Sequence, residues 1–307
     1  MNDNKIINDN FALAGVLEAI LLIALVAIII SMIQLYYVPE MMEQKEADHM
    51  DQVSNQFAQL KSVIEIQAMM GAMDTGEPIT YTPMSSQINL GSKELPYFIS
   101  ARSYGQIDLI DEETTPNYKI SIIPAPGDFP DGIPLTSIKY EAENFYFVDQ
   151  IYILEGGGII LEQPSEGEVM RVYPGIVVEN DTKLNNNINI KYFIPLFKGV
   201  PGKKVWADYK ECYVHTNFTN HYSYSGSANL IYIATDYPNA WLDCLLNESR
   251  GILWEYFDNG YINIILDDTV TPNKIEITPS PGFTINLDLT IAEIGVQVGP
   301  GYAIPKS

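Results

Sequence analysis

The chain has 307 residues, 47% of them hydrophobic, so it can form a substantial core and does not have the composition of a disordered protein. Its 39 acidic side chains against 17 basic ones give a formal net charge of −22. This balance disfavours nucleic acids and anionic membrane surfaces as partners, because both are bound through lysine and arginine. We expect the excess acid on a solvated exterior.

An apolar stretch over residues 11–33 dominates the N-terminal part of the chain. Its sequence is FALAGVLEAILLIALVAIIISMI, and Glu18 is its only ionisable side chain. At the rise of an α-helix it is about 34 Å long, enough to cross a hydrocarbon core of about 30 Å. Tyr36 and Tyr37 follow at the position where aromatic side chains mark a membrane interface. We therefore predict a transmembrane or filament-core helix over residues 11–38.

The ten residues before this stretch, MNDNKIINDN, are polar, and Lys5 is their only basic side chain. We predict a short cytoplasmic segment over residues 1–10, because basic residues mark the cytoplasmic side of a span. The apolar stretch is longer than the core of a signal peptide, and no small-x-small cleavage site follows it. We expect it to stay attached, as a single-pass span with the rest of the chain outside the cell.

A second helical pattern follows Pro39 and predicts an amphipathic helix over residues 39–72. Its apolar side chains recur at spacings of three and four residues, with charged and amide side chains between them: Met50, Val53, Phe57, Leu60 and Ile64. This apolar face can pack against the chain's own β body, which we favour, or against a second copy. Two heptads are too few to require a coiled coil.

The pattern changes from helical to β after residue 72. Residues 73–96 are rich in Gly, Pro, Ser and Thr, and we predict a linker there. Further on the apolar period becomes two, most clearly over residues 188–194 and 285–291. Two apolar runs around three glycines indicate a β-hairpin over residues 151–161. We therefore predict an α+β fold with a mainly antiparallel, sandwich-like β body.

The β body contains an internal repeat. Residues 105–127, GQIDLIDEETTPNYKISIIPAPG, match residues 260–282, GYINIILDDTVTPNKIEITPSPG, with one residue shifted across the turn. Each copy indicates a strand, an acidic turn ending in Thr-Pro-Asn, a second strand and Pro-x-Pro-Gly. We interpret the repeat as two related β units, over residues 97–200 and 201–307.

The acidic turns of the repeat offer oxygen ligands of the kind that calcium binds: Asp111, Glu112, Asp267 and Asp268. They lack the ligand spacing of an EF-hand, and solvated turns explain them equally well. His215 and His221 do not match a zinc-binding pattern. No pair of nucleophile and base stands out. We therefore expect no enzymatic activity and no cofactor, with calcium as the weak metal candidate.

Two kinds of covalent modification are compatible with a body outside the cell. Cys212 and Cys244 are the only cysteines. They can form one disulfide, and the alternative is two buried free thiols. Three Asn-x-Ser/Thr sequons, at Asn180, Asn217 and Asn247, predict N-glycosylation sites.

The chain also contains 20 tyrosines and three tryptophans, Trp206, Trp241 and Trp254. Exposed aromatic rings can stack on sugars, whereas buried rings fill β cores. We favour the core for these side chains.

The apolar N-terminal helix with one early glutamate, its amphipathic continuation and the β body together resemble the archaeal type IV pilin-like proteins. The resemblance covers residues 8–70. It implies cleavage by a prepilin-type peptidase ahead of the apolar stretch, with Ala14, Gly15 and Val16 at the new N-terminus. It also implies that Glu18 pairs with the amino terminus of a neighbouring subunit in a filament. The β body is similar to large uncharacterised archaeal exported proteins.

Together these features favour a non-enzymatic, membrane-anchored surface protein, a pilin-like structural component of a filament or cell envelope. Its partners would be membrane lipid or other pilin-like subunits, bound through the N-terminal helix. The alternative is a membrane-tethered extracellular module whose β body recognises glycans or a partner protein. An extracytoplasmic hydrolase ranks third.

Overall fold

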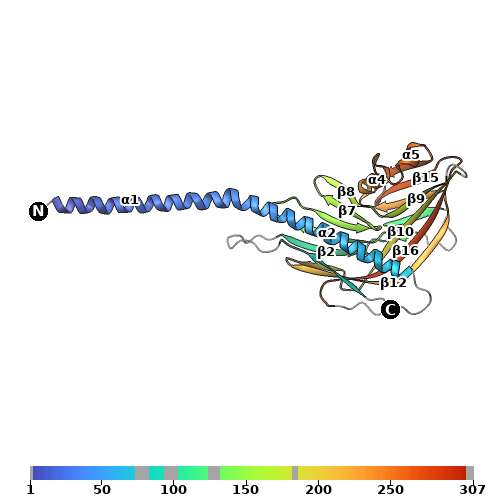
Figure 1. Ribbon diagram of the computed structural model, residues 1–307, viewed down its shortest axis with the longest axis horizontal. Helices are drawn as coiled ribbons and strands as arrows, with labels where there is room; N and C mark the ends of the chain where they lie inside the picture. Colours follow the sequence, from blue (N-terminus) through green and yellow to red (C-terminus); the bar gives the residue numbers. More distant parts are fainter. Residues whose placement is uncertain (1–2, 73–82, 93–102, 124–131, 182–185, 302–307) are drawn as a thin grey trace.

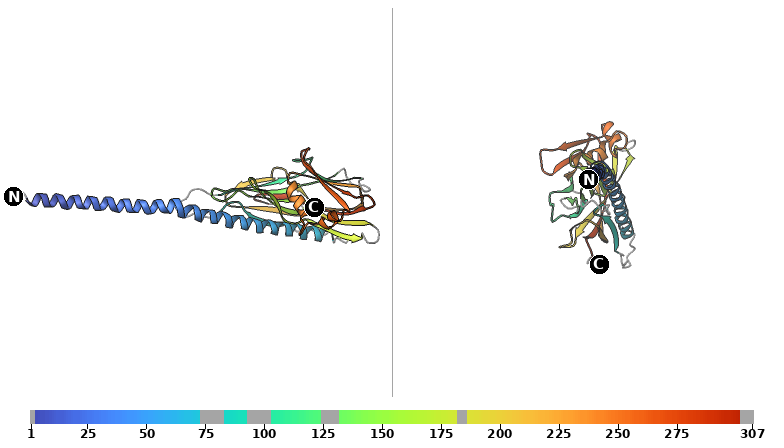
Figure 2. Two further views of the ribbon diagram at one scale, coloured as in Figure 1. Left: turned by 90° about the horizontal axis from the view of Figure 1, so that it is seen from above. Right: turned by 90° about the vertical axis from the view of Figure 1, so that its left-hand side faces the viewer.

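The computed structural model describes residues 3–72, 83–92, 103–123, 132–181 and 186–301. One long N-terminal helix projects away from a β-rich body, and its second half lies along that body (Figure 1). Figure 2 shows the same arrangement from two further directions. The fold is therefore α+β with a mainly antiparallel β body, as the sequence predicts.

The N-terminal helix runs without interruption through three segments. These are α1 (Asp3–Met32), the π-helical turn η1 (Ile33–Tyr37) and α2 (Val38–Ala72). The helix begins at Asp3, so most of the polar segment predicted over residues 1–10 belongs to it. Pro39 lacks an N–H and its ring crowds the carbonyl group of Leu35. The wider π-helical turn contains Leu35, so the helix passes the proline without a break.

The described residues of the body form three sheets, in which all neighbouring strands are antiparallel except β10 and β16. In order across the sheet, sheet A contains β1 (Met84–Asn89), β12 (Glu211–Ala228), β16 (Thr284–Val298), β10 (Asn187–Gly199) and β9 (Gly175–Asp181). Sheet B contains β11 (Val205–Asp208), β2 (Tyr104–Ile110), β5 (Ser137–Glu143), β6 (Ile151–Glu155), β7 (Gly158–Gln163) and β8 (Gly167–Val172). Sheet C contains β14 (Ile262–Asp267), β15 (Asn273–Pro279), β13 (Leu230–Thr235), β3 (Lys119–Ile123) and β4 (Ile133–Pro134). The described part of the body also contains two short helices, α4 (Pro238–Leu246) and α5 (Trp254–Asp258).

The segment predicted as a linker over residues 73–96 contains a strand. Within its described part, β1 pairs with β12 at the edge of sheet A. Residues 73–82 and 93–96 of the predicted linker lie outside the described residues. The linker prediction is therefore wrong for β1, whose polar sequence MSSQIN suits an edge strand with one solvated face.

The predicted hairpin over residues 151–161 is confirmed. β6 and β7 pair in antiparallel register around Gly156 and Gly157. Both glycines have a positive φ, 55° and 80°, as a two-residue type I′ turn requires. All residues of β6 are buried, because sheet B is covered on both faces at this point.

The internal repeat is visible in sheet C, where β3 and β15 lie on opposite sides of β13. Ile231 of β13 pairs with Ile122 on one side and with Ile277 on the other. These two residues occupy equivalent positions in the repeat. The first strands of the two copies differ in placement, since β2 lies in sheet B whereas β14 pairs with β15. Residues 124–127, which include the first Pro-x-Pro-Gly, lie outside the described part.

The division predicted near residue 200 does not follow a boundary in the fold. Each of the three sheets contains strands from both sides of this position. The parallel pair β10 and β16 joins residues before position 200 to the C-terminal strand throughout its length. The repeated segments are therefore parts of interwoven sheets rather than of two separate units.

The described residues of the body form two hydrophobic cores. The three-sheet core lies between sheets A, B and C and α4, and includes Ile120, Ile153, Ile190, Ile231, Trp241, Ile277 and Leu287. The α2 core lies between α2 and sheets A and B, and includes Phe57, Leu60, Ile107, Tyr140, Val214, Ile294 and Val296. β16 contributes to both cores because its buried positions change from odd to even numbers after Ile291.

Candidate membrane segment and its attachment to the body

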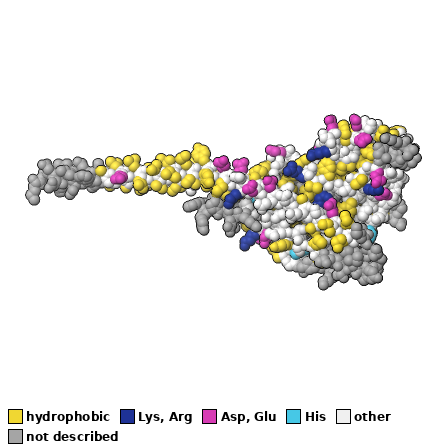
Figure 3. Space-filling model, in the orientation of Figure 1, with side chains coloured by type: hydrophobic (Ala, Val, Ile, Leu, Met, Phe, Trp, Pro, Cys, Tyr) yellow, Lys and Arg dark blue, Asp and Glu magenta, His cyan; other side chains and the backbone are white. Residues whose placement is uncertain are grey.

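The candidate functional element is the exposed part of the N-terminal helix. Every side chain from residue 14 to residue 37 is exposed, including Leu21, Ile23 and Leu35. Figure 3 shows hydrophobic atoms covering the described part of this projecting helix. Within the described chain, one helix is long and apolar enough to cross a membrane, and its apolar window has a mean hydropathy of 3.0. A helix that is apolar all round suits hydrocarbon better than water.

Glu18 and Tyr36 lie near the two ends of the apolar surface. Both side chains are exposed. Tyr36 follows Glu18 by 18 positions, which correspond to about 27 Å of helix, close to the thickness of a hydrocarbon core. Ala14, Gly15 and Val16, which we predicted as a processing region, are exposed and lie within the continuous helix, two to four residues before Glu18.

The second half of the helix is attached to the body through its apolar face. Burial along the helix begins at Val38, immediately after Tyr37. The predicted apolar face of residues 50–64 is at most 1% exposed and lies in the α2 core. The ring of Phe57 lies 6.3 Å from that of Tyr140 and 6.0 Å from that of Tyr152. The prediction that this face packs on the chain's own β body is therefore confirmed.

Polar side chains on the same face of α2 fix the helix along the edge of sheet A. Gln56 Oε1 accepts a hydrogen bond of 2.9 Å from the N–H of Asn89. His49 Nε2 lies 3.2 Å from the carbonyl oxygen of Asn89. Further along, Gln67 Nε2 donates to the carbonyl oxygen of Thr216 at 3.0 Å. Burial lowers the pKa of His49, so this side chain is held in its neutral form.

Glu46 makes the strongest polar attachment near the start of α2. Its side chain is fully buried, and its carboxylate accepts backbone hydrogen bonds from Phe145, Tyr146 and Phe147, at 3.2, 2.8 and 2.8 Å. Three donors satisfy a buried carboxylate that would otherwise be costly. Sequence analysis missed this residue. Its position could have indicated that it is buried. Glu46 lies four residues after Met42 and four residues before Met50, and therefore on the same apolar face of the helix.

In the structure, carboxylates of the acidic turns contact other groups of the protein. Asp111 pairs with Lys204 at 2.6 Å, and Glu113 pairs with the same ammonium group at 2.8 Å. Burial alone would raise the pKa of Asp111, but Lys204 and the Thr114 hydroxyl outweigh it and hold the pKa below its usual value. Asp267 accepts hydrogen bonds from Thr269. The described residues contain no group of three or more His, Cys, Asp or Glu side chains that could hold a metal ion.

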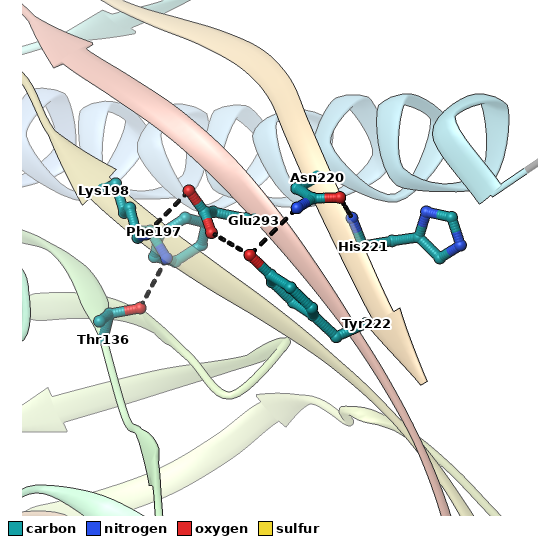
Figure 4. Close-up of polar contacts among 7 residues, drawn as sticks. All are labelled: Thr136, Phe197, Lys198, Asn220, His221, Tyr222 and Glu293. Atoms are coloured by element: carbon teal, nitrogen blue, oxygen red, sulfur yellow. Dashed lines mark hydrogen bonds and ion pairs between the residues drawn. The ribbon is translucent and has the colours of Figure 1, made fainter. Parts of the chain in front are cut away.

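A second buried carboxylate, Glu293, connects β10, β12 and β16. It pairs with Lys198 at 2.9 Å, and the hydroxyl of Tyr222 donates to it at 3.4 Å (Figure 4). Asn220 Nδ2 in turn donates to the Tyr222 oxygen at 3.1 Å. Lys198 also lines a cavity of about 270 Å³ that includes Asp111 to Glu113 and Leu196 to Gly199. The ion pair between Lys198 and Glu293 joins β10 to β16.

Glu155, at the end of β6, was also missed by sequence analysis. Its carboxylate accepts hydrogen bonds from Thr235 Oγ1 at 2.8 Å and from Trp241 Nε1 at 2.9 Å. Burial raises the pKa of Glu155 to about 7, against the effect of these two hydrogen bonds. A glutamate beside a Gly-Gly turn is usually solvated, so the sequence alone carries no signal for its burial.

Of the two alternatives for the cysteines, the structure has the buried free thiols and not the disulfide. Cys212 and Cys244 are both buried free thiols. Cys212 lies on β12 in the α2 core, whereas Cys244 lies on α4 in the three-sheet core. Burial raises the pKa of both thiols, to about 11 for Cys212 and about 12 for Cys244. Both side chains are therefore unreactive in the folded protein.

The three sequons have different surroundings. The side chain of Asn217 is only 3% exposed, so the folded body has no room for a glycan there. Asn247 ends α4 and is half-buried, and its Nδ2 donates to Asp243 at 2.8 Å. Asn180 lies on β9, where its backbone pairs with Ile188.

The histidines and tryptophans named in the sequence analysis are not gathered into one site. His215 Nδ1 lies 2.7 Å from the hydroxyl of Ser85, and His221 is exposed further along β12. Trp241 is fully buried in the three-sheet core. Trp206 and Trp254 are half-buried. The preference for cores over stacking platforms is therefore confirmed for Trp241.

The chain was compared with protein-family models, curated proteins and solved structures, and none of the three comparisons found a match.

Proposed function

We propose that this chain is a non-enzymatic surface protein, anchored by a single pass of α1 through the membrane and carrying its β body on the outer side. The observation that carries the proposal is the change of exposure along one continuous helix. All side chains from residue 14 to residue 37 are exposed, whereas the apolar face of α2, which begins at Met42, is buried. Exposed apolar surface of this extent is unfavourable in water, and a bilayer removes that cost.

The test is membrane extraction of the full chain. We expect wild-type protein to stay with membranes after alkaline carbonate washing and to be released only by detergent. Replacing Leu21 and Leu25 with arginine should raise the free energy of membrane insertion of α1 by about 5–7 kcal/mol. We therefore expect this variant in the soluble fraction. The matched control replaces Ile66 and Met69, which are exposed on α2, with arginine, and leaves extraction unchanged. Wild-type protein released by carbonate alone would contradict the anchor.

We further propose that the anchored chain is a pilin-like structural component of a filament or cell envelope. This is supported by the continuous helix, by the exposure of Glu18 and of Ala14 to Val16, and by the attachment of α2 to the body. A processed helix starting near Ala14 would still contain the exposed apolar surface described from residue 14 to Tyr37. Glu18 would then lie near a new amino terminus of a neighbouring subunit.

Two measurements test the pilin-like form. Mass spectrometry of the native protein should find an N-terminus near Ala14, and electron microscopy should find filaments. An intact Met1 without filaments would leave only the simple anchor. Protease treatment of intact cells should digest the β body, because the proposal places it outside. Binding of the purified full chain to a glycan array, without filaments, would instead favour the tethered binding module.

A further inference from the structure

The loop between β5 and β6 carries two exposed aromatic side chains at the end of the body from which α1 projects. Phe145 is 64% exposed and Tyr146 is 39% exposed. The next residue, Phe147, points inward and packs against the α2 core. The loop thus presents two adjacent rings to its surroundings while a third anchors it.

The conformation of this loop is fixed by hydrogen bonds. Asn144 Nδ2 donates to the carbonyl oxygen of Val148 at 3.0 Å, and Asp149 accepts a hydrogen bond of 2.8 Å from the N–H of Asn144. The Glu46 carboxylate accepts the N–H groups of the three aromatic residues. The exposed rings are therefore held on the same rigid helix that carries the candidate membrane segment.

The position of Glu46 places the loop close to the expected membrane surface. Glu46 follows Tyr37 by nine residues, or about 14 Å along the helix axis. Helical side chains point back toward the N-terminus, which brings the carboxylate nearer to Tyr37 than its Cα atom is. Figure 1 shows the green ribbons of sheet B beside the part of α2 nearest to α1. Aromatic rings held beside Glu46 can reach the headgroup region of the bilayer. Tyrosine and other amphipathic rings are favoured in that region.

We propose that Phe145 and Tyr146 form a second membrane contact, which inserts into the interfacial region of the bilayer that α1 crosses. The partner is a zwitterionic or neutral lipid interface, because the chain has a net charge of −22 and Glu40, Glu43 and Asp48 lie beside the loop's attachment point on α2. This contact fixes the tilt of the body relative to the membrane. It rests on the proposed membrane anchoring by α1.

The experiment uses the full chain in phosphatidylcholine vesicles, with a fluorescent NBD label on single introduced cysteines. Cys212 and Cys244 are buried and do not label under native conditions, and unmodified protein provides the blank. The label is placed by Tyr146→Cys, by Leu25→Cys in α1 and by Met69→Cys. Met69 is exposed on the same helix, about 48 Å beyond Tyr37. Lipids that carry quenchers near the headgroup or deep in the acyl chain report the depth of each label.

We expect headgroup quenchers to quench the label at position 146, deep quenchers to quench position 25, and neither to quench position 69. Quenching at 25 without quenching at 146 would overturn the second contact and leave the anchor intact. No quenching at 25 would instead contradict the proposed function itself. A blue shift at 146 that lipid quenchers do not affect, and that grows with protein density, would assign the rings to a second copy of the chain and overturn the lipid contact.

A second variant separates the loop from the rest of the fold. Glu46→Gln keeps the size of the side chain but replaces the carboxylate that holds the three N–H groups. We expect it to lower headgroup quenching at position 146 while quenching at position 25 stays unchanged. The same change at Glu43, an exposed glutamate on α2, is the matched control and leaves both signals as they are. Equal quenching at 146 in the Glu46 and Glu43 variants would contradict the role of Glu46 in positioning the rings.

Discussion

The indole Nε1 of Trp241 on α4 donates a hydrogen bond of 2.9 Å to the carboxylate of Glu155 at the end of β6. The same oxygen atom accepts the hydroxyl of Thr235 on β13 at 2.8 Å. One carboxylate therefore connects sheet B, sheet C and α4 inside the three-sheet core. The adjacent carbonyl oxygen of Gly156 accepts a hydrogen bond from the Tyr192 hydroxyl at 2.8 Å, which adds sheet A to the connection.

Burial of Glu155 makes the stability of the fold depend on pH. The pKa of Glu155 rises from 4.5 to about 7 in the folded protein, so between these values the folded state binds more protons than the unfolded state. The free energy of unfolding should therefore fall as pH rises from 4.5 to 7, by up to about 3 kcal/mol from this group. Glu155→Gln removes this contribution. Urea denaturation of the full chain in detergent, followed at several pH values, measures the difference.

The matched control for this prediction is Glu248→Gln, at an exposed glutamate after α4. It should preserve the wild-type dependence on pH. A Glu155→Gln variant that loses stability in parallel with wild type between pH 4.5 and pH 7 would show that Glu155 does not titrate in this window.

The buried cysteines give a prediction about covalent state. Because Cys212 and Cys244 are free and lie in different cores, the protein purified without reductant should show two reactive thiols per chain after denaturation. In the folded protein neither thiol should react quickly with a disulfide reagent, since burial raises both pKa values. Cys244→Ser should reduce the count in denaturant to one. Denatured wild-type protein that shows no thiols until reductant is added would contradict the free state.

The attachment of α2 to the body should depend on Phe57. This ring is fully buried between α2 and sheet B, so Phe57→Ala should lower the free energy of unfolding by about 3–5 kcal/mol. Hydrogen exchange should then show faster exchange over α2. Ile66→Ala, at an exposed position on the same helix, should change stability by less than about 0.5 kcal/mol. Similar losses in the two variants would mean that α2 is not held by its buried face.

The helical parts of this fold were predictable because their signals are local. The spacing of Met50, Phe57 and Ile64 is a property of one helix and identifies its buried face without knowledge of the partner. The continuation of the helix past Pro39 was not predictable, because it depends on a π-helical turn that the pattern of apolar residues does not encode.

The arrangement of the strands was predictable only in part, because strand pairing joins residues far apart in the chain. Alternation over residues 188–194 and 285–291 identified two strands, but nothing in either segment specifies that β10 and β16 pair in parallel. The same limit applies to the cysteines. A count of two allows a disulfide, and only the fold shows that Cys212 and Cys244 lie in separate cores.

The end of α2 offers a test of close packing between helix and sheet. A Cβ atom on Gly71 would collide with the ring of Phe218 on β12, which is buried in the α2 core. Gly71→Ala should therefore lower the free energy of unfolding by about 1–3 kcal/mol, although alanine favours the helix itself. Gly15→Ala is the matched control, since no atom lies within 4 Å of its added Cβ, and it should not destabilise the body.

A shorter side chain at position 218 should relieve this collision. Phe218→Leu by itself should lower the free energy of unfolding, because it removes buried contacts. The double variant with Gly71→Ala should lose less than the sum of the losses in the two single variants. Urea denaturation of the four proteins, followed by tryptophan fluorescence, gives the coupling energy. A coupling of zero would mean that the helix end moves away from β12 to accommodate alanine. A double variant that loses less stability than this sum would show that the Phe218 ring occupies the space where a side chain at position 71 would lie.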